Sequence, residues 1–217
     1  LNFPKMFMNT FVIAIFTCII STIFVLSVAY SMSRMRFKMR KPFMNIAMII
    51  GLFPSFMSMI AVYYILRALN LADGAMIRVA LIIVFSAGSG AGFYVAKGFF
   101  DTISKSLDEA AIIDGATRWN VFTKITVPLS KPIIVYTILT SFMGPWVDFI
   151  FGKVICRADA QYYTVSIGLW KMLEKEYIDS WYTCFAAGAV VVSIPIAILF
   201  LMTQKFYVEG MTGAVKG

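Results

Sequence analysis

The chain lacks histidine and is poor in charge. None of its 217 residues is His and 14% are charged, so no imidazole is available as a catalytic base or a metal ligand. The three cysteines, Cys18, Cys156 and Cys184, lack the paired spacing of a zinc site or a redox motif. The sequence also contains no evident pairing of a nucleophile with a base. We therefore expect no catalytic residue, metal site or cofactor on this chain, which argues against a membrane-embedded enzyme.

A nucleotide-binding loop is missing as well. The pattern Gly-x-x-x-x-Gly-Lys-Ser/Thr, which cradles phosphates, occurs nowhere in the sequence. The glycines of Gly88-Ser-Gly-Ala-Gly92 lie instead in an apolar stretch, and Gly88, Gly92 and Ala96 recur every four residues. Small residues at that spacing let two helix backbones approach closely in a membrane. We expect helix packing here, and no ATP binding by this chain.

Apolar sequence is abundant. Hydrophobic residues make up 60% of the chain and the mean hydropathy is +0.84, too apolar for an ordinary soluble domain. Five stretches reach the length needed to cross a bilayer, where the backbone must be helical because lipid offers it no hydrogen-bond partner. These stretches cover about residues 11–32, 43–66, 76–100, 133–154 and 182–203. We predict an all-α integral membrane protein, a polytopic helix bundle with residues 1–217 in a single domain.

The distribution of positive charge predicts the orientation of the spans. Residues 34–41 hold five Lys and Arg and no acid, the strongest signal in the chain for a cytoplasmic loop. This places residues 101–131 and the tail 204–217 in the cytoplasm, and the loop 155–181 outside. The net charge of +8 is concentrated beside apolar spans, so we expect contact with membrane lipid and none with nucleic acid. We also expect residues 34–41 to set topology without binding the transported solute.

The cytoplasmic segment 101–131 contains helix-capping signals. Ser106 precedes Glu109 by three residues, the spacing of a capping box, which predicts a helix that begins near Leu107. Asp114-Gly115 should end this helix, because glycine adopts the left-handed C-terminal conformation at little cost.

A second short helix should follow. Thr117 is placed to cap it, and it should run to about Thr126, where the approach to Pro128 would end it. Two helices of about two turns are far too short to cross a membrane. The segment is therefore expected in water or among lipid headgroups, where a soluble protein could dock.

These residues resemble the EAA loop of ABC importer permeases, whose consensus is Glu-Ala-Ala, a later Gly and an Ile/Leu-x-Pro ending. Glu109, Ala110, Ala111 and Gly115 match it, and Ile125 with Pro128 falls in its terminal part. An ordinary loop of an unrelated membrane protein is the alternative. The resemblance implies that this loop transmits force to a cytosolic ATPase through Glu109, Ala110, Ala111, Asp114, Gly115, Ala116, Arg118 and Trp119.

Other stretches are similar to the carbohydrate branch of that family. Trp146-Val-Asp-Phe149 resembles the Trp-Asn-Asp/Glu-Phe signature of sugar-importer permeases, with Val147 in place of Asn. Residues 207–217 and Ser31-Met-Ser-Arg-Met-Arg-Phe37 resemble the maltose-type "G" permease. The resemblance implies a type I ABC importer permease fold, in which a further N-terminal span would precede the five visible here. It favours sugars over amino acids, metals, phosphate or polyamines.

The resemblance also implies a biological setting. The chain would be a non-enzymatic permease subunit for a sugar or oligosaccharide in a bacterial-type inner or plasma membrane, with its C-terminus in the cytoplasm. Its partners would be a second permease subunit, two cytosolic ATP-binding subunits that hold ATP and magnesium, and an extracytoplasmic solute-binding protein. The alternatives are a permease for a non-sugar solute or a secondary transporter, which would couple transport through intramembrane ionisable groups or broken helices.

Three residues near the end of the fourth predicted span are candidates for lining the pathway: Trp146, Asp148 and Phe149. Asp148 is the one carboxylate inside a predicted span, and such a group is costly enough to suggest a function. Alternatively it lies hydrated near the helix end or pairs with Lys153. The aromatic rings could face a sugar or could anchor the helix at the membrane interface.

Two further segments could contact partner proteins. In the tail, Thr212, Gly213 and Ala214 are candidate contacts with the ATPase, although short Gly-containing termini are generally disordered. Residues 164–177 have apolar side chains at helical spacing and read as an interfacial helix. That helix could meet a substrate-delivery protein or simply cover the bundle.

Overall fold

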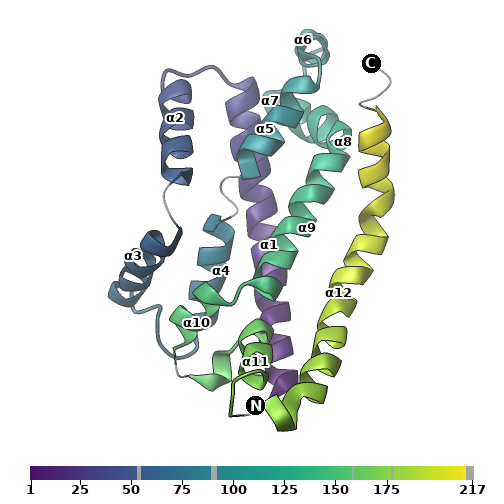
Figure 1. The fold of residues 1–217 in the computed structure, drawn as a ribbon. Helices are drawn as coiled ribbons and strands as arrows, with labels where there is room; N and C mark the ends of the chain where they lie inside the picture. The colour runs from purple at the N-terminus through teal and green to yellow at the C-terminus, as the bar shows by residue number, and fades with distance from the viewer. Residues whose placement is uncertain (53–54, 89–91, 158, 177, 214–217) are drawn as a thin grey trace.

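Figure 1 shows the computed structural model, a bundle built from α-helices and short helical turns. The structure describes residues 1–52, 55–88, 92–157, 159–176 and 178–213, and none of these residues lies in a strand. The predicted all-α class is confirmed. The first element, α1 (Phe3–Arg34), has its most extensive contacts with α9 (Lys131–Val147), then with α5 (Gly92–Thr102) and α4 (Met76–Gly88).

Helix α1 begins eight residues before the predicted span because Asn2 caps it. The Asn2 side chain accepts a hydrogen bond from the Lys5 N–H at 3.2 Å, and Pro4 occupies the first turn, where no N–H is needed. The buried side of α1 includes Ala14 and Ala29, small side chains that allow close contact with α9 and α5.

Three predicted spans are interrupted in the structure. The stretch 43–66 falls on α2 (Arg40–Gly51) and α3 (Ser55–Ala68), and 76–100 falls on α4 and α5, which meet at a 43° bend. The stretch 133–154 falls on α9 and α10 (Ile150–Cys156). By length and composition, two helices of the described chain could cross a membrane, or up to four if each bent pair is one span. The number and limits of the spans therefore stay predictions.

The small-residue face predicted in the third span lies against α1. Ala96 is fully buried, and a Cβ added at Gly92 would lie 3.8 Å from the Val25 side chain, so the two helices approach closely there. Gly88 has no atom within 4 Å of its virtual Cβ, and residues 89–91 of the predicted motif lie outside the described residues. Close packing thus holds at Gly92 and Ala96.

The two ends of the bundle differ (Figure 1). At one end lie α6 (Lys105–Ile113), α7 (Arg118–Val121) and α8 (Val127–Leu129), with the turn between α1 and α2 and the last turns of α12 (Ile178–Gly213). At the opposite end lie α10, the short η3 (Ala160–Tyr162), α11 (Val165–Met172) and the N-terminus. A buried cluster that includes Val25, Phe93, Phe100 and Ile133 packs α1, α5 and α9 together beneath the first of these ends.

Candidate coupling site

The first cap of α6 is Ser104, two residues earlier than predicted. The Ser104 hydroxyl accepts a hydrogen bond from the Ser106 N–H at 3.3 Å, and the helix begins at Lys105. Glu109 makes no reciprocal bond within the described part of the chain. The predicted Ser106–Glu109 capping box and the start near Leu107 are therefore wrong, because a closer hydroxyl satisfies the free N–H groups first.

The C-terminal end of α6 is as predicted. Gly115 has φ +86°, the left-handed conformation that glycine adopts without strain. Its N–H donates to Ile112 O at 3.0 Å, and the Ala116 N–H donates to Ala111 O at 2.9 Å. This pair of bonds is the Schellman motif, which satisfies carbonyls that the helix itself leaves free. Asp114-Gly115 thus fixes the turn between α6 and α7.

The second helix starts as predicted but continues further. The Thr117 hydroxyl accepts a hydrogen bond from the Asn120 N–H at 3.2 Å and caps α7. The chain then passes through η2 (Phe122–Thr126), a π-helical turn, into α8. The predicted end near Thr126 is wrong, because Pro128 occupies the first turn of α8, where its missing N–H is not needed. The helical run 118–129 meets α9 at an angle of 81°.

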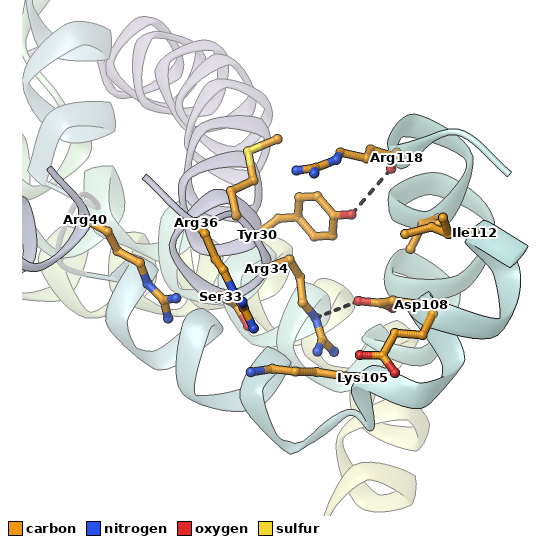
Figure 2. Close-up of a pocket in the computed structure, with 12 residues that line it drawn as sticks. Tyr30, Ser33, Arg34, Arg36, Arg40, Lys105, Asp108, Ile112 and Arg118 are labelled. Atoms are coloured by element: carbon orange, nitrogen blue, oxygen red, sulfur yellow. Dashed lines mark hydrogen bonds and ion pairs between the residues drawn. The ribbon is translucent and has the colours of Figure 1, made fainter. Parts of the chain in front are cut away.

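Arg34 joins three elements at this end of the bundle (Figure 2). Its Nη2 donates hydrogen bonds to Phe100 O at 3.0 Å and to Ile103 O at 2.8 Å, at the C-terminal end of α5. Its Nε lies 3.2 Å from Asp108 Oδ2 of α6, and the two side chains are 5% and 13% exposed. A cation is favourable beside the free carbonyls at a helix C-terminus. The last turn of α1 therefore holds α6 against the end of α5.

Neighbouring residues of α1 extend this attachment. Ser33 Oγ donates to Asp101 Oδ1 at 2.6 Å, and the Tyr30 hydroxyl donates to Arg118 O at 3.4 Å. The Tyr30 ring also lies 4.6 Å from the Phe122 ring, centroid to centroid. Contacts from α1 thus reach α5, α6, α7 and η2.

The two sides of α6 face different surroundings. One side lines a cavity of about 360 Å³ between α6, α7 and the end of α1 (Figure 2). The other side carries Leu107, Ala110 and Ile113 at helical spacing, all exposed, with Ile113 85% exposed; Trp119 of α7 is 69% exposed. We call these four residues the docking face. Exposed apolar side chains gathered in this way mark a protein-contact surface.

The structure brings the predicted coupling residues together in the α6–α7 hairpin. Six of them are exposed and two, Ala111 and Ala116, are half-buried. The exposed ones are Glu109, Ala110, Asp114, Gly115, Arg118 and Trp119. Their role in coupling stays a prediction. The Arg34–Asp108 pair was missed from sequence, since Arg34 was interpreted only as a topology signal.

The predicted pathway residues do not form one surface. Trp146 is buried, with its ring 5.2 Å from Phe7 and 5.9 Å from Phe142, while Phe149 lies 4.9 Å from Trp170. Asp148 lies between α9 and α10, where its Oδ1 accepts the Gly152 N–H at 3.0 Å.

The suggested partner of Asp148, Lys153, makes no ion pair among the described residues. It lies over the Tyr163 ring, 5.8 Å from its centroid. The geometry thus gives Asp148 a capping contact, and a pathway role for Trp146, Asp148 and Phe149 stays a prediction.

The candidate partner contacts outside the hairpin are placed only in part. Helix α12 extends through Thr212 and Gly213, and Ala214 lies outside the described residues, so contact of the tail with an ATPase stays a prediction. Of the predicted interfacial stretch 164–177, α11 covers Val165–Met172 and packs against α12 and α1. Val165, Ile167, Gly168 and Met172 are buried, which favours a covering role; Tyr177 lies outside the described residues.

These features define a class: a membrane-spanning helix bundle with a short capped hairpin at one end. The family model described as "Binding-protein-dependent transport system inner membrane component" matches residues 23–211, and the chain belongs to this family. It is 35% identical to the galactooligosaccharides transport system permease protein GanQ of Bacillus subtilis (strain 168), covering 100% of this chain and 76% of GanQ. It is 32% identical to the maltodextrin transport system permease protein MalD of Streptococcus pneumoniae (strain ATCC BAA-255 / R6), covering 97% and 74%.

A solved structure has a similar fold. The crystal structure of a bacterial ABC transporter involved in the import of the acidic polysaccharide alginate includes a chain with a TM-score of 0.77 and 26% identity. The match covers 94% of this chain and 75% of that one. The resemblance to ABC importer permeases inferred from the EAA loop is confirmed, and the protein is a membrane component of a transport system.

Proposed function

We propose that the chain is the permease subunit of an ATP-driven ABC importer for a sugar or oligosaccharide, and that the α6–α7 hairpin couples it to a cytosolic ATPase. The relatives named for galactooligosaccharides and maltodextrin support the sugar assignment. The partners are a second permease subunit, two ATP-binding subunits that hold ATP and magnesium, and an extracytoplasmic solute-binding protein. The chain itself contributes half of the translocation pathway and no catalytic group.

The observation that carries the proposal is the docking face. Large apolar side chains on a capped hairpin, at one end of a membrane protein, are stable in water only when a partner covers them. Ile113 and Trp119 are the largest exposed groups of this face. The hairpin is also fixed to α1 by the Arg34–Asp108 contact, so a force applied at the docking face reaches the membrane helices.

The mechanism is alternating access by rigid-body motion. Closure of the ATPase dimer moves α6, and the attachment through Arg34 carries the ends of α1 and α5 with it. In this arrangement α6, the turn after α1 and the tail of α12 all face the cytoplasm, at the same end of the bundle (Figure 1). The cytoplasmic C-terminus follows from that assignment.

A pull-down tests the docking face. Trp119→Ala should weaken recovery of the ATPase subunit about 30-fold, because truncating a large aromatic group at the centre of an interface removes roughly 2 kcal/mol. Trp170→Ala is the matched control, since Trp170 is also exposed but lies at the opposite end of the bundle. Equal ATPase recovery from both variants would contradict the assignment of the docking face.

Uptake into proteoliposomes tests the transport mechanism. Labelled oligosaccharide should accumulate only when the ATPase subunit and ATP are both present. A non-sugar permease would show the same ATP dependence with another solute. Accumulation driven by an ion gradient alone would identify a secondary transporter and would contradict the proposal.

A further inference from the structure

Five of the twelve residues that line the cavity beside α6 are cations. Arg36 and Arg40 approach it from the turn after α1 and the start of α2, and Lys105 and Arg118 approach it from α6 and α7 (Figure 2). Within the described residues, none of these four side chains makes an ion pair or donates a hydrogen bond. Two carboxylates also line the cavity, and one of them, Asp108, is already paired with Arg34. Four cations thus surround the space with one unpaired carboxylate.

Water screens these cations in part, since Arg36, Lys105 and Arg118 are exposed, but an anion in the cavity would be attracted to all four. Like charges held around one concave space raise the local potential and concentrate counter-ions there. Glu109, the remaining carboxylate, is exposed and offsets only one of the four charges. The cavity therefore favours a ligand that carries at least one negative charge and several acceptor oxygens, as a phosphate group does.

Part of the lining is apolar. Tyr30, Met35, Ile112 and Val121 contribute to the walls, and Tyr30 and Val121 belong to the packed interior. The cavity also lies where α1 ends and the chain turns into α2, at the limit of an apolar helix. A cationic rim beside an apolar wall at this depth suits an amphiphile better than a free ion.

We propose that this cavity binds the phosphate headgroup of an anionic phospholipid from the cytoplasmic leaflet. The anionic lipids of that leaflet attract basic residues at its surface, and basic pockets between membrane helices hold their headgroups. The assignment to the cytoplasmic leaflet rests on the orientation in the proposed function. A bound headgroup would bridge the α1–α2 turn and the α6–α7 hairpin, so lipid composition would act on the coupling segment.

Native mass spectrometry of the full chain, purified in mild detergent with its co-purifying partners, tests this binding. Wild-type protein should retain phosphatidylglycerol in preference to phosphatidylcholine. The double variant Arg36→Gln/Lys105→Gln should lose roughly 30-fold in apparent affinity, because each cation in contact with the headgroup phosphate strengthens binding about fivefold.

The matched control is Lys38→Gln/Lys41→Gln, which removes the same charge from the α1–α2 turn and the start of α2. Lys38 and Lys41 are exposed and do not line the cavity. This control should retain phosphatidylglycerol within about twofold of wild type. Equal losses of phosphatidylglycerol affinity in the two double variants would show that only general surface charge matters, and would overturn the proposal.

Two further experiments test whether the ligand is a free phosphate ion or an acidic surface of the ATPase subunit. Inorganic phosphate, titrated in detergent without lipid, should not compete with phosphatidylglycerol at millimolar concentration; efficient competition would make the ligand a free ion. Addition of excess ATPase subunit should leave the lipid bound. Displacement of the lipid would assign the cavity to an acidic surface of the partner.

The orientation is tested separately. In a Cys18→Ser/Cys184→Ser background, which removes the half-buried and the exposed native thiols, Lys38→Cys should resist a membrane-impermeant maleimide added to intact cells. Labelling from outside would refute the orientation in the proposed function, and the headgroup site would then face the other leaflet. The affinity difference between the two double variants does not depend on the labelling result. A wrong orientation and the absence of a headgroup site are therefore distinguished by separate measurements.

Discussion

Replacing Arg34 by Gln should detach the coupling hairpin from the helix bundle. The substitution keeps most of the side-chain length but removes the positive charge beside Asp108 and the donors to the carbonyls of Phe100 and Ile103. Asp108 is 13% exposed, so its largely buried carboxylate would lose its ion-pair partner. The expected consequence is opening of α6 rather than global unfolding, because the buried clusters of α1, α5 and α9 do not depend on this contact.

The magnitude follows from the burial of the pair. Breaking a buried ion pair by removing one partner costs about 3–5 kcal/mol, whereas an exposed pair contributes about 0–1 kcal/mol. Arg157 and Asp73 form such an exposed pair, with side chains 47% and 71% exposed. Arg157→Gln is therefore the matched control. Since 1.4 kcal/mol is a factor of ten, Arg34→Gln should raise the opening constant of α6 by two orders of magnitude or more.

Hydrogen exchange of residues 104–121 measures that opening, and ATP-dependent uptake measures its consequence. Protection should fall in Arg34→Gln and stay unchanged in Arg157→Gln. Adding Asp108→Asn to Arg34→Gln should recover part of the loss, because it removes the unpaired buried charge. Equal exchange rates and equal uptake in Arg34→Gln and Arg157→Gln would show that the Arg34–Asp108 contact does not hold α6 against the bundle.

Three other perturbations test separate features. Gly115→Val should add about 1 kcal/mol or more of backbone strain and reduce both ATPase recovery and uptake, whereas Gly74→Val, also at positive φ but at the opposite end, should leave ATPase recovery intact. Burial raises the pKa of the Cys156 thiol to about 12, so this residue should resist maleimide at pH 8 until the protein is denatured. Because Cys184 is exposed, peptide mapping must locate the label, and labelling of Cys156 in the native protein would contradict its burial. Deleting residues 211–217 should preserve membrane insertion but lower coupled ATP hydrolysis, and full coupling would show that the tail has no contact with the ATPase.

The features that sequence reasoning predicted correctly depend on local chemistry. The turn at Gly115 follows from the one residue that accepts φ +86° without strain, and the cap at Thr117 follows from a hydroxyl three residues before a free N–H. The small residues Gly92 and Ala96 indicated a close helix contact that α1 supplies. Each of these signals lies within a few residues of the feature it specifies.

The features that were missed depend on competition between nearby capping residues or on contacts between residues far apart in the sequence. Ser104 and Ser106 offer equivalent hydroxyls, and only the position of the preceding helix end decides which one caps α6. The helix breaks at Asp148 within a stretch of continuous hydropathy. A distant side chain stabilises this break, because Ser166 Oγ of α11 donates a hydrogen bond to the Asp148 carbonyl. The Arg34–Asp108 pair joins residues 74 positions apart, and a single sequence holds no signal for such a contact.

Helix α1 connects the coupling hairpin to the opposite end of the bundle. Its last turn holds α6 through Arg34, and near its start Asn9 Nδ2 donates to Tyr163 O at 3.2 Å while Thr10 Oγ1 accepts the Val165 N–H at 2.8 Å. Its 32 residues form one unbroken helix of about 48 Å. Polar contacts fix α1 at both ends, so we expect a displacement of α6 to be transmitted along α1 to residues 160–165.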